Sequence, residues 1–293
     1  MSRLEVLKTY KIYIGGKFPR TESGRYYTPL NAKGEQLGNI CMSSRKDVRN
    51  AVVAARKALG GWSERPAFNR GQILYRIAEM LEGRKEQFVK EICFQGKSKK
   101  AAEAEVDLTI DRLIYYAGWS DKYTQILSSV NPVASSHFNF SVTEPSGVVG
   151  IITDEKTSLI GLVSLIAPAI TGGNTVVVLA STNMPLCAVT FAEVLNSSDV
   201  PGGVVNILTG EKPEMVKTLS THMDVNSITY SGIEAEVIKS LREESVSNLK
   251  RIKSYDRNWE KKDAQDLYMI ADLQEVKTTW HPIENIGGAT SSY

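Results

Sequence analysis

The second half of the chain alternates short apolar runs with amphipathic segments, and this alternation restricts the fold more than any other feature. Apolar runs separated by helical periodicity are typical of parallel strands whose sheet is covered on both faces. The expected strands are residues 148–152, 175–179, 204–208 and 225–230, and the expected helices are 159–170, 185–195, 213–219 and 234–241. The pattern therefore predicts an α/β fold built on a parallel sheet.

The first half is mainly helical in pattern. Ser44 is a suitable N-cap and Asp47 follows three residues later, so a helix is expected to begin there. Apolar residues then repeat at helical spacing over 70–93 and again over 101–123. A period of two over 136–142 predicts an amphipathic strand that forms half of a hairpin. Near the end, the strongly polar residues 258–266 indicate a connecting loop or a short exposed helix.

Composition and charge exclude several classes of partner. The 293 residues are 42% hydrophobic and 23% charged, with a net charge of +2, which gives no reason to expect nucleic acid or a membrane surface. The N-terminus lacks the apolar core of a secretory signal, so a cytoplasmic location is expected. The cysteines and histidines are scattered without metal-ligand spacing, so neither a metal site nor a disulfide framework is expected. They are Cys41, Cys93, Cys187, His137, His222 and His281.

Several short segments, each weak by itself, share their order and spacing with one enzyme family. They are residues 14–17, 54–58, 61–62, 116–122, 144–150, 167–169, 173–177 and 201–206. On these segments the chain resembles the aldehyde dehydrogenase superfamily. The resemblance implies the Rossmann-like, doubly wound parallel sheet of that family's cofactor-binding domain, here over 1–127 and 146–262. It also implies a hairpin and C-terminal strand for oligomerisation, over 128–145 and 270–293.

The family's cofactor and oxyanion positions carry other residues in this chain. Relatives place an Asn at the position of Lys156, where its amide helps to stabilise the oxyanion. A lysine could do this in principle, but the acidic neighbours fit a solvated, charged turn better. The family's Lys and Glu that hold the adenosine ribose correspond to Leu179 and Thr182. Leucine has no polar group with which to bind a hydroxyl.

The family's phosphate-binding turn is also altered. Gly232 is kept, but Ile233 replaces a hydroxyl residue, and Glu234 and Glu236 follow at the expected helix start. Two carboxylates there would occupy the field that attracts a pyrophosphate. No cofactor is therefore expected, and NAD(P) remains only as part of an alternative.

The chemistry of the family also has no matching residues. The general base, a Glu, falls on Tyr255, and no cysteine matches the nucleophile. Only about twenty residues separate Tyr255 from a segment that resembles the family's closing strand, which leaves no room for the catalytic domain. The resemblance is thus to the second, catalytically incomplete module of two-module aldehyde dehydrogenases, and we expect a pseudoenzyme.

The segments that build the oligomer interface in the family remain recognisable. The candidate interface residues are Phe138, Phe140, Val276, Thr278 and Trp280. An amphipathic strand at a chain end needs a partner strand, either from its own hairpin or from another polypeptide. Both pairings stay open at this point.

Three functions follow as hypotheses. The first is a non-catalytic scaffold or regulatory module that self-associates or pairs with an active aldehyde dehydrogenase. The second is a reduced NAD(P)-dependent oxidoreductase that acts on aldehydes with an altered site, and the third is a small-ligand sensor that uses the vestigial cleft.

Overall fold

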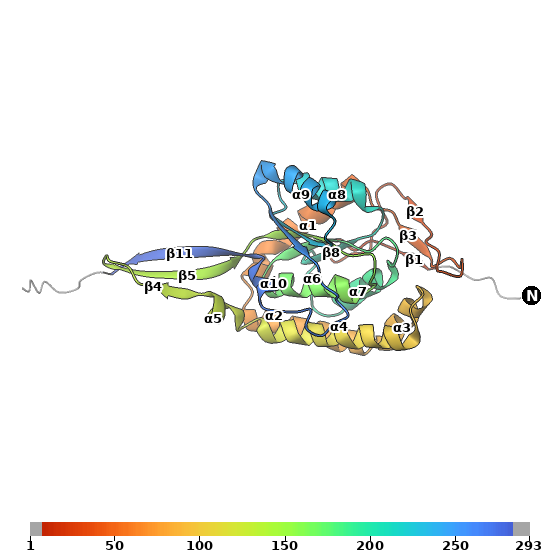
Figure 1. Cartoon of the computed structure of the whole chain (residues 1–293), viewed down its shortest axis with the longest axis horizontal. Helices are drawn as coiled ribbons and strands as arrows, with labels where there is room; N and C mark the ends of the chain where they lie inside the picture. Colours follow the sequence, from red (N-terminus) through yellow and green to blue (C-terminus); the bar gives the residue numbers. More distant parts are fainter. Residues whose placement is uncertain (1–7, 284–293) are drawn as a thin grey trace, which may run out of the picture.

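The computed structural model describes residues 8–283, and its centre is a five-stranded parallel sheet (Figure 1). The strands lie in the order β10-β9-β6-β7-β8, each parallel to its neighbours. They are β6 Val148–Ile152, β7 Thr175–Leu179, β8 Val205–Leu208, β9 Ser227–Ser231 and β10 Arg251–Tyr255. The predicted parallel α/β fold is confirmed. Strand β10 was not predicted, because polar residues alternate along it.

Helices cover both faces of this sheet, and every residue of β6, β7, β8 and β9 is therefore buried. Figure 1 shows α1, α8 and α9 over one face and α6 and α7 over the other, with α2, α3 and α4 as an outer layer beyond α6 and α7. The helices are α1 Arg45–Ser63, α2 Ala67–Glu82, α3 Lys85–Phe94, α4 Lys99–Trp119, α6 Ile160–Thr171, α7 Leu186–Asn196, α8 Lys212–Thr221 and α9 Ala235–Glu244. No helix within residues 8–283 is long and apolar enough to cross a membrane.

One helix start was predicted correctly and one helix was not. Helix α1 begins after Ser44, whose N–H donates to the Asp47 carboxylate at 2.8 Å, as the capping pattern predicts. The single helix expected over 70–93 is wrong, because the chain divides it into α2 and α3 at Gly83. Glycine has a low helix propensity, so a helix readily ends there. The spacing of apolar residues is the same in one long helix as in two successive helices, so it does not reveal the break.

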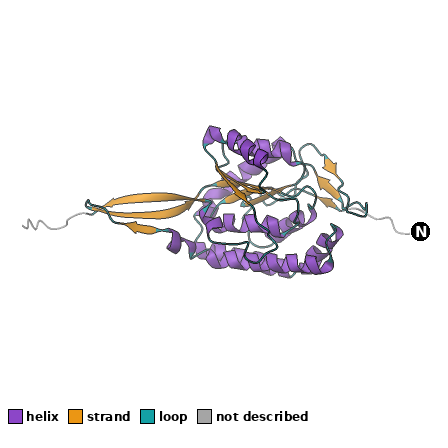
Figure 2. Cartoon of the chain, in the orientation of Figure 1, coloured by secondary structure: helices purple, strands orange, loops and turns teal. Residues whose placement is uncertain are grey.

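A second, three-stranded sheet projects away from the helices and the parallel sheet (Figures 1 and 2). It contains β4 Ser129–Asn131, β5 His137–Pro145 and β11 Gln274–Pro282, in the antiparallel order β11-β5-β4, and follows the short helix α5 Tyr123–Leu127. The expected tail strand is thus β11, and it pairs with β5 of its own chain along its whole length. The remainder of the predicted tail, 284–293, lies outside the described residues. A third small sheet near the N-terminus joins β1 Thr9–Tyr10, β3 Asn39–Cys41 and β2 Tyr26–Tyr27.

The register of the projecting sheet separates the five candidate interface residues. Alternate residues of a strand point to opposite faces, and directly paired residues share a face. Thr278 pairs with Ser141, so Thr278 lies on one face with Val276 and Trp280. Phe140 pairs with Thr279, the next residue of β11, so the two phenylalanines lie on the other face. The five residues therefore belong to one sheet but to two surfaces.

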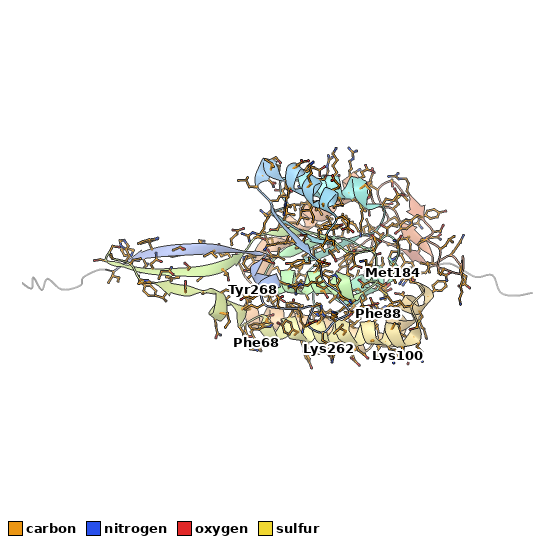
Figure 3. All side chains as sticks on the ribbon, viewed as in Figure 1. Phe68, Phe88, Lys100, Met184, Lys262 and Tyr268 are labelled. Atoms are coloured by element: carbon orange, nitrogen blue, oxygen red, sulfur yellow. The ribbon has the colours of Figure 1, made fainter. Side chains whose placement is uncertain are left out.

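A packed junction links β10 to β11 through the short helix α10 Tyr268–Ala271. The polar stretch 258–266 is a loop, but it is not wholly exposed, because Trp259 and Ala264 are buried in the main core. Met269, Ile270 and Leu273 extend the same core. In Figure 3, Tyr268 lies near the base of the projecting sheet and Lys262 lies along α4.

The fully buried Arg112 of α4 holds this junction in place. Its guanidinium donates to the carbonyls of Ala264 and Lys261 at 2.8 and 2.9 Å, to that of Trp259 at 3.4 Å, and to the Ser164 hydroxyl of α6 at 2.7 Å. All four acceptors are neutral; three belong to the junction and the fourth to α6. The junction is therefore fastened to α4 and α6 by one side chain.

We predict that Arg112→Ala lowers the free energy of unfolding by about 3 kcal/mol, because it leaves buried carbonyls without donors. The matched control is Arg76→Ala, which removes an exposed arginine paired with Glu79 and should change stability by no more than about 0.5 kcal/mol. Urea unfolding of the three proteins measures both values. Equal effects of the two substitutions would contradict the anchoring role.

Candidate functional site

A cavity of about 550 Å³ lies at the carboxyl ends of the central strands. It is lined by the segments that follow β6, β9 and β10, together with Lys212 at the start of α8. The connection order reverses between β6 and β9, and ligands of open α/β sheets bind at such a reversal point. This cavity is therefore the candidate site.

The loop after β6 is closed by its own acidic residue. The Asp154 carboxylate accepts the N–H groups of Lys156 and Thr157 at 2.6 and 2.7 Å. This turn leaves the Lys156 side chain exposed at the cavity rim. Its charge acts on Glu234 across the cavity and contributes to the lowered pKa of that carboxyl.

Glu155 connects the ends of three strands. Its carboxylate accepts from the Ser181 hydroxyl at 2.7 Å and the Asn183 N–H at 3.0 Å, both after β7, and pairs with Lys212 after β8. Lys212 also donates to the Thr153 carbonyl at 2.6 Å. Burial lowers the pKa of Lys212, and the Glu155 charge opposes that shift. The ammonium thus binds two groups of this chain, the Glu155 carboxylate and the Thr153 carbonyl.

The two residues at the family's ribose positions do not face the cavity. Leu179 is fully buried in the apolar core beneath α1 and α8. The Thr182 hydroxyl donates to the Gly210 carbonyl at 3.0 Å, which joins the loops after β7 and β8. Neither residue is among those that line the cavity.

A carboxylate occupies the start of α9. Glu234 is the N-cap residue, and the Tyr230 hydroxyl donates to its carboxylate. This hydrogen bond is the main cause of the lowered pKa of Glu234. A Cβ atom at Gly232 would lie only 2.4 Å from a Glu234 carboxylate oxygen, so the acid covers the glycine turn. Ile233 points outward and is 60% exposed.

A second carboxylate occupies the start of α6. One oxygen of the buried Glu105, on α4, accepts the N–H groups of Ser158, Leu159 and Ile160 at 3.1, 2.8 and 3.2 Å. Its other oxygen pairs with Lys97 at 2.7 Å. Free N–H groups at a helix start are what binds a phosphate, and here a side chain of the same protein uses them.

Trp259 fills the gap between β9 and α6. Its indole N–H donates to the Ser231 hydroxyl at 2.8 Å, and its ring borders Gly161 in the first turn of α6. Tyr255 packs edge-on against it, with ring centroids 6.2 Å apart, and donates its hydroxyl to Asp272 at 3.0 Å. Burial raises the pKa of Tyr255, so this phenol is a poor general base.

The structure brings four of the predicted positions together around the cavity: Lys156, Gly232, Ile233 and Tyr255. Sequence reasoning missed Glu105, Lys212 and Trp259. Only Trp259 carried a signal, as an isolated large aromatic residue within a polar stretch. Glu105 and Lys212 are ordinary charged residues in sequence, and their roles arise only from tertiary contacts.

No cysteine in the described part of the chain lines the cavity. Cys41 and Cys187 are buried, and burial raises the pKa of the Cys187 thiol well above its usual value. A thiolate nucleophile requires the opposite shift. The residues around the cavity can position, pair and donate hydrogen bonds, but none of them is an activated nucleophile.

The doubly wound parallel sheet, with its crevice between β6 and β9, defines a Rossmann-like dinucleotide-binding scaffold. Within this class the chain belongs to the aldehyde dehydrogenase family, whose profile matches residues 19–254. The match ends directly before Tyr255, where the packed junction begins.

Individual relatives agree with this assignment. A putative aldehyde dehydrogenase, DhaS, from Bacillus subtilis is 32% identical over 249 residues, which cover 83% of this chain and 50% of that protein. Retinal dehydrogenase 2 from Mus musculus is 34% identical, over 84% of this chain and 48% of its own length. Cytosolic 10-formyltetrahydrofolate dehydrogenase from Xenopus laevis is 30% identical, over 86% of this chain and 29% of its own. The chain thus spans about half or less of the curated relatives it matches.

Solved structures give the same picture. The NAD+ complex of an aldehyde dehydrogenase from Bacillus cereus superimposes with a TM-score of 0.80 at 26% identity. The superposition covers 84% of this chain and 50% of that one. The family's cofactor-binding architecture, expected from the resemblance, is confirmed.

We predict that Glu155→Gln destabilises the fold by about 1–2 kcal/mol near pH 7, because buried Lys212 then loses its paired carboxylate and only the charge of Asp154 still acts on it. The pKa of Lys212 in the folded state falls further below its unfolded value. Between those two values the unfolded chain binds more protons, so stability rises with pH and the deficit shrinks toward about pH 10. Urea unfolding across this range measures it.

The control for this series is Glu214→Gln, which removes one partner of the exposed pair with Arg45. It should change the free energy of unfolding by no more than about 0.5 kcal/mol, and this difference from the wild type should stay constant at alkaline pH. A deficit in Glu155→Gln that is constant with pH would contradict the buried pairing of Lys212.

Proposed function

We propose that this chain is a non-catalytic, aldehyde-dehydrogenase-like scaffold or regulatory module that self-associates or pairs with an active aldehyde dehydrogenase. One observation carries the proposal: side chains of the chain itself lie at the helix starts beside the carboxyl ends of the central strands, where such folds receive the phosphates of a ligand. Glu234 lies at the start of α9, Glu105 at the start of α6, and Trp259 between β9 and α6. A pyrophosphate would have to displace or repel a carboxylate at either helix start.

The residues at the family's catalytic positions support the same proposal. Tyr255 replaces the general base and is buried against Asp272, while Lys156 replaces the oxyanion-binding amide and is exposed. Aldehyde oxidation in this family needs a thiolate, an oxyanion-stabilising donor, a base and a hydride acceptor. The family positions within the described residues supply none of these in a competent form.

The projecting sheet supports the association half of the proposal. Strand β11 is an edge strand of nine residues, so one row of its backbone groups is free of strand partners within the described chain. One face of the projecting sheet carries the exposed side chains of Val276 and Trp280, and the opposite face carries exposed Phe138. Long edge strands with exposed apolar residues are surfaces that pair with another chain.

Titration calorimetry with NAD+ and NADP+ tests the cofactor half. We predict no binding tighter than about 1 mM, because a carboxylate at each helix start would repel the pyrophosphate. A cysteine-bearing aldehyde dehydrogenase measured alongside serves as the positive control. Binding at sub-millimolar concentration would favour the reduced oxidoreductase and would overturn this half of the proposal.

Light scattering tests the association half. We predict that Trp280→Ser weakens association. The Kd for self-association, or for binding to an aldehyde dehydrogenase of the same cell, should rise at least about tenfold over that of the wild type. Tyr75→Ser on α2 is the matched control, because Tyr75 and Trp280 are both 57% exposed. A wild-type protein that is monomeric and does not bind the dehydrogenase would contradict this half of the proposal.

A further inference from the structure

A small pocket separate from the cleft lies between the end of α9 and the start of β10. Its volume is about 340 Å³, and its lining includes Ser245, Val246, Leu249, Lys250 and Ile252. Three of these residues are apolar, yet the pocket also contains an ammonium group. Lys250 is only 7% exposed, which is unusual for a lysine.

No carboxylate pairs with Lys250 in the described part of the chain. Its only hydrogen-bond acceptor within residues 8–283 is the side-chain oxygen of Asn248, and it takes part in no ion pair there. Asn248 is itself fixed, because its amide donates to the carbonyls of Met223 and Val225 at 3.0 and 3.1 Å. The ionisable groups around the pocket are Arg242 on α9 and His222 after α8, with Asp224 beside His222.

Because burial desolvates this amine, its pKa falls to about 8. Near pH 7.4 such an amine is roughly one-fifth neutral, whereas a lysine of ordinary pKa is roughly one-thousandth neutral. A neutral amine is the nucleophilic form, and desolvated lysines attack carbonyl carbon for this reason. The group is chemically prepared for a reaction that exposed lysines perform poorly.

The backbone beside Lys250 keeps the pocket in shape. Leu249 has a left-handed conformation, with φ of 54°, and its side chain is 88% exposed. A leucine in this conformation is strained and persists only where neighbouring contacts impose it. The buried Ser245 hydroxyl, which has no hydrogen-bond partner in the described chain, lies in the same lining. The pocket therefore offers one amine beside the largely exposed apolar side chains of Val246 and Leu249.

We propose that Lys250 is a covalent site for short aliphatic aldehydes, which it binds as a reversible imine. The nitrogen lone pair attacks the carbonyl carbon to give a carbinolamine, and loss of water then forms the C=N bond. No oxidant or reductant is consumed. The protonated imine keeps one N–H, which continues to donate to Asn248, and the alkyl chain lies against Val246, Leu249 and Ile252. This site is independent of the cleft and of the proposed scaffold function.

The test is competitive labelling of the wild-type protein with propanal and cyanoborohydride, which reduces any imine to a stable secondary amine. Peptide mass spectrometry then gives a rate for each lysine. A less basic amine is a weaker nucleophile, but a much larger fraction of Lys250 is neutral. The second effect is larger, so the labelling rate of Lys250 should be at least about tenfold higher than that of exposed Lys239 near pH 7.4. The rate at Lys250 should level off above about pH 8.

Equal labelling of Lys250 and Lys239, or slower labelling of Lys250, would overturn the proposal. The comparison is made within one folded protein, so it does not depend on the folding of a variant. Asn248→Ala adds a second check, since loss of the acceptor should reduce the rate at Lys250 and leave that at Lys239 unchanged. An unchanged rate at both lysines would show that the pocket does not orient the amine.

Discussion

The contact between the Arg112 guanidinium and the junction is the interaction on which the distinctive part of this structure depends. It fixes the carbonyls of Trp259, Lys261 and Ala264 against α4 and α6. Because Trp259 is held there, its indole reaches Ser231 and fills the gap between β9 and α6. The junction is therefore a fitted part of the core, and Trp259 forms one wall of the crevice, which keeps a cavity of about 550 Å³.

Side chains of the chain itself satisfy the polar groups around the crevice. Buried N–H groups at a helix start must be satisfied, whether by a ligand or by the protein. Glu105 does this for α6, Glu234 occupies the start of α9, and the Glu155–Lys212 pair joins the loops beside them. Each of these side chains supplies the fold with a contact at the carboxyl end of the central sheet.

The sequence predicts the parts of this molecule that depend on local periodicity. The strands from Val148 onward and the start of α1 follow from apolar spacing and capping, both of which are local. The break at Gly83, strand β10 and the burial of Trp259 depend on neighbours far along the chain, so local patterns miss them. The differences from the family expected at Leu179, Thr182, Ile233 and Tyr255 rest on sequence alone, whereas the contacts of Glu105, Lys212 and Trp259 around the crevice were not predicted.

Hydrogen exchange, measured by mass spectrometry with and without millimolar NAD+, tests most directly whether the junction is a fixed part of the crevice. The account predicts that the hydrogen-bonded amides of Lys261 and Ala264 and those of the first turn of α6 exchange well below the rate of an unfolded chain. It also predicts that the nucleotide leaves these rates unchanged. Unprotected amides at these positions, or protection that appears only when NAD+ is added, would show a crevice that is ordered by the cofactor and would contradict the account.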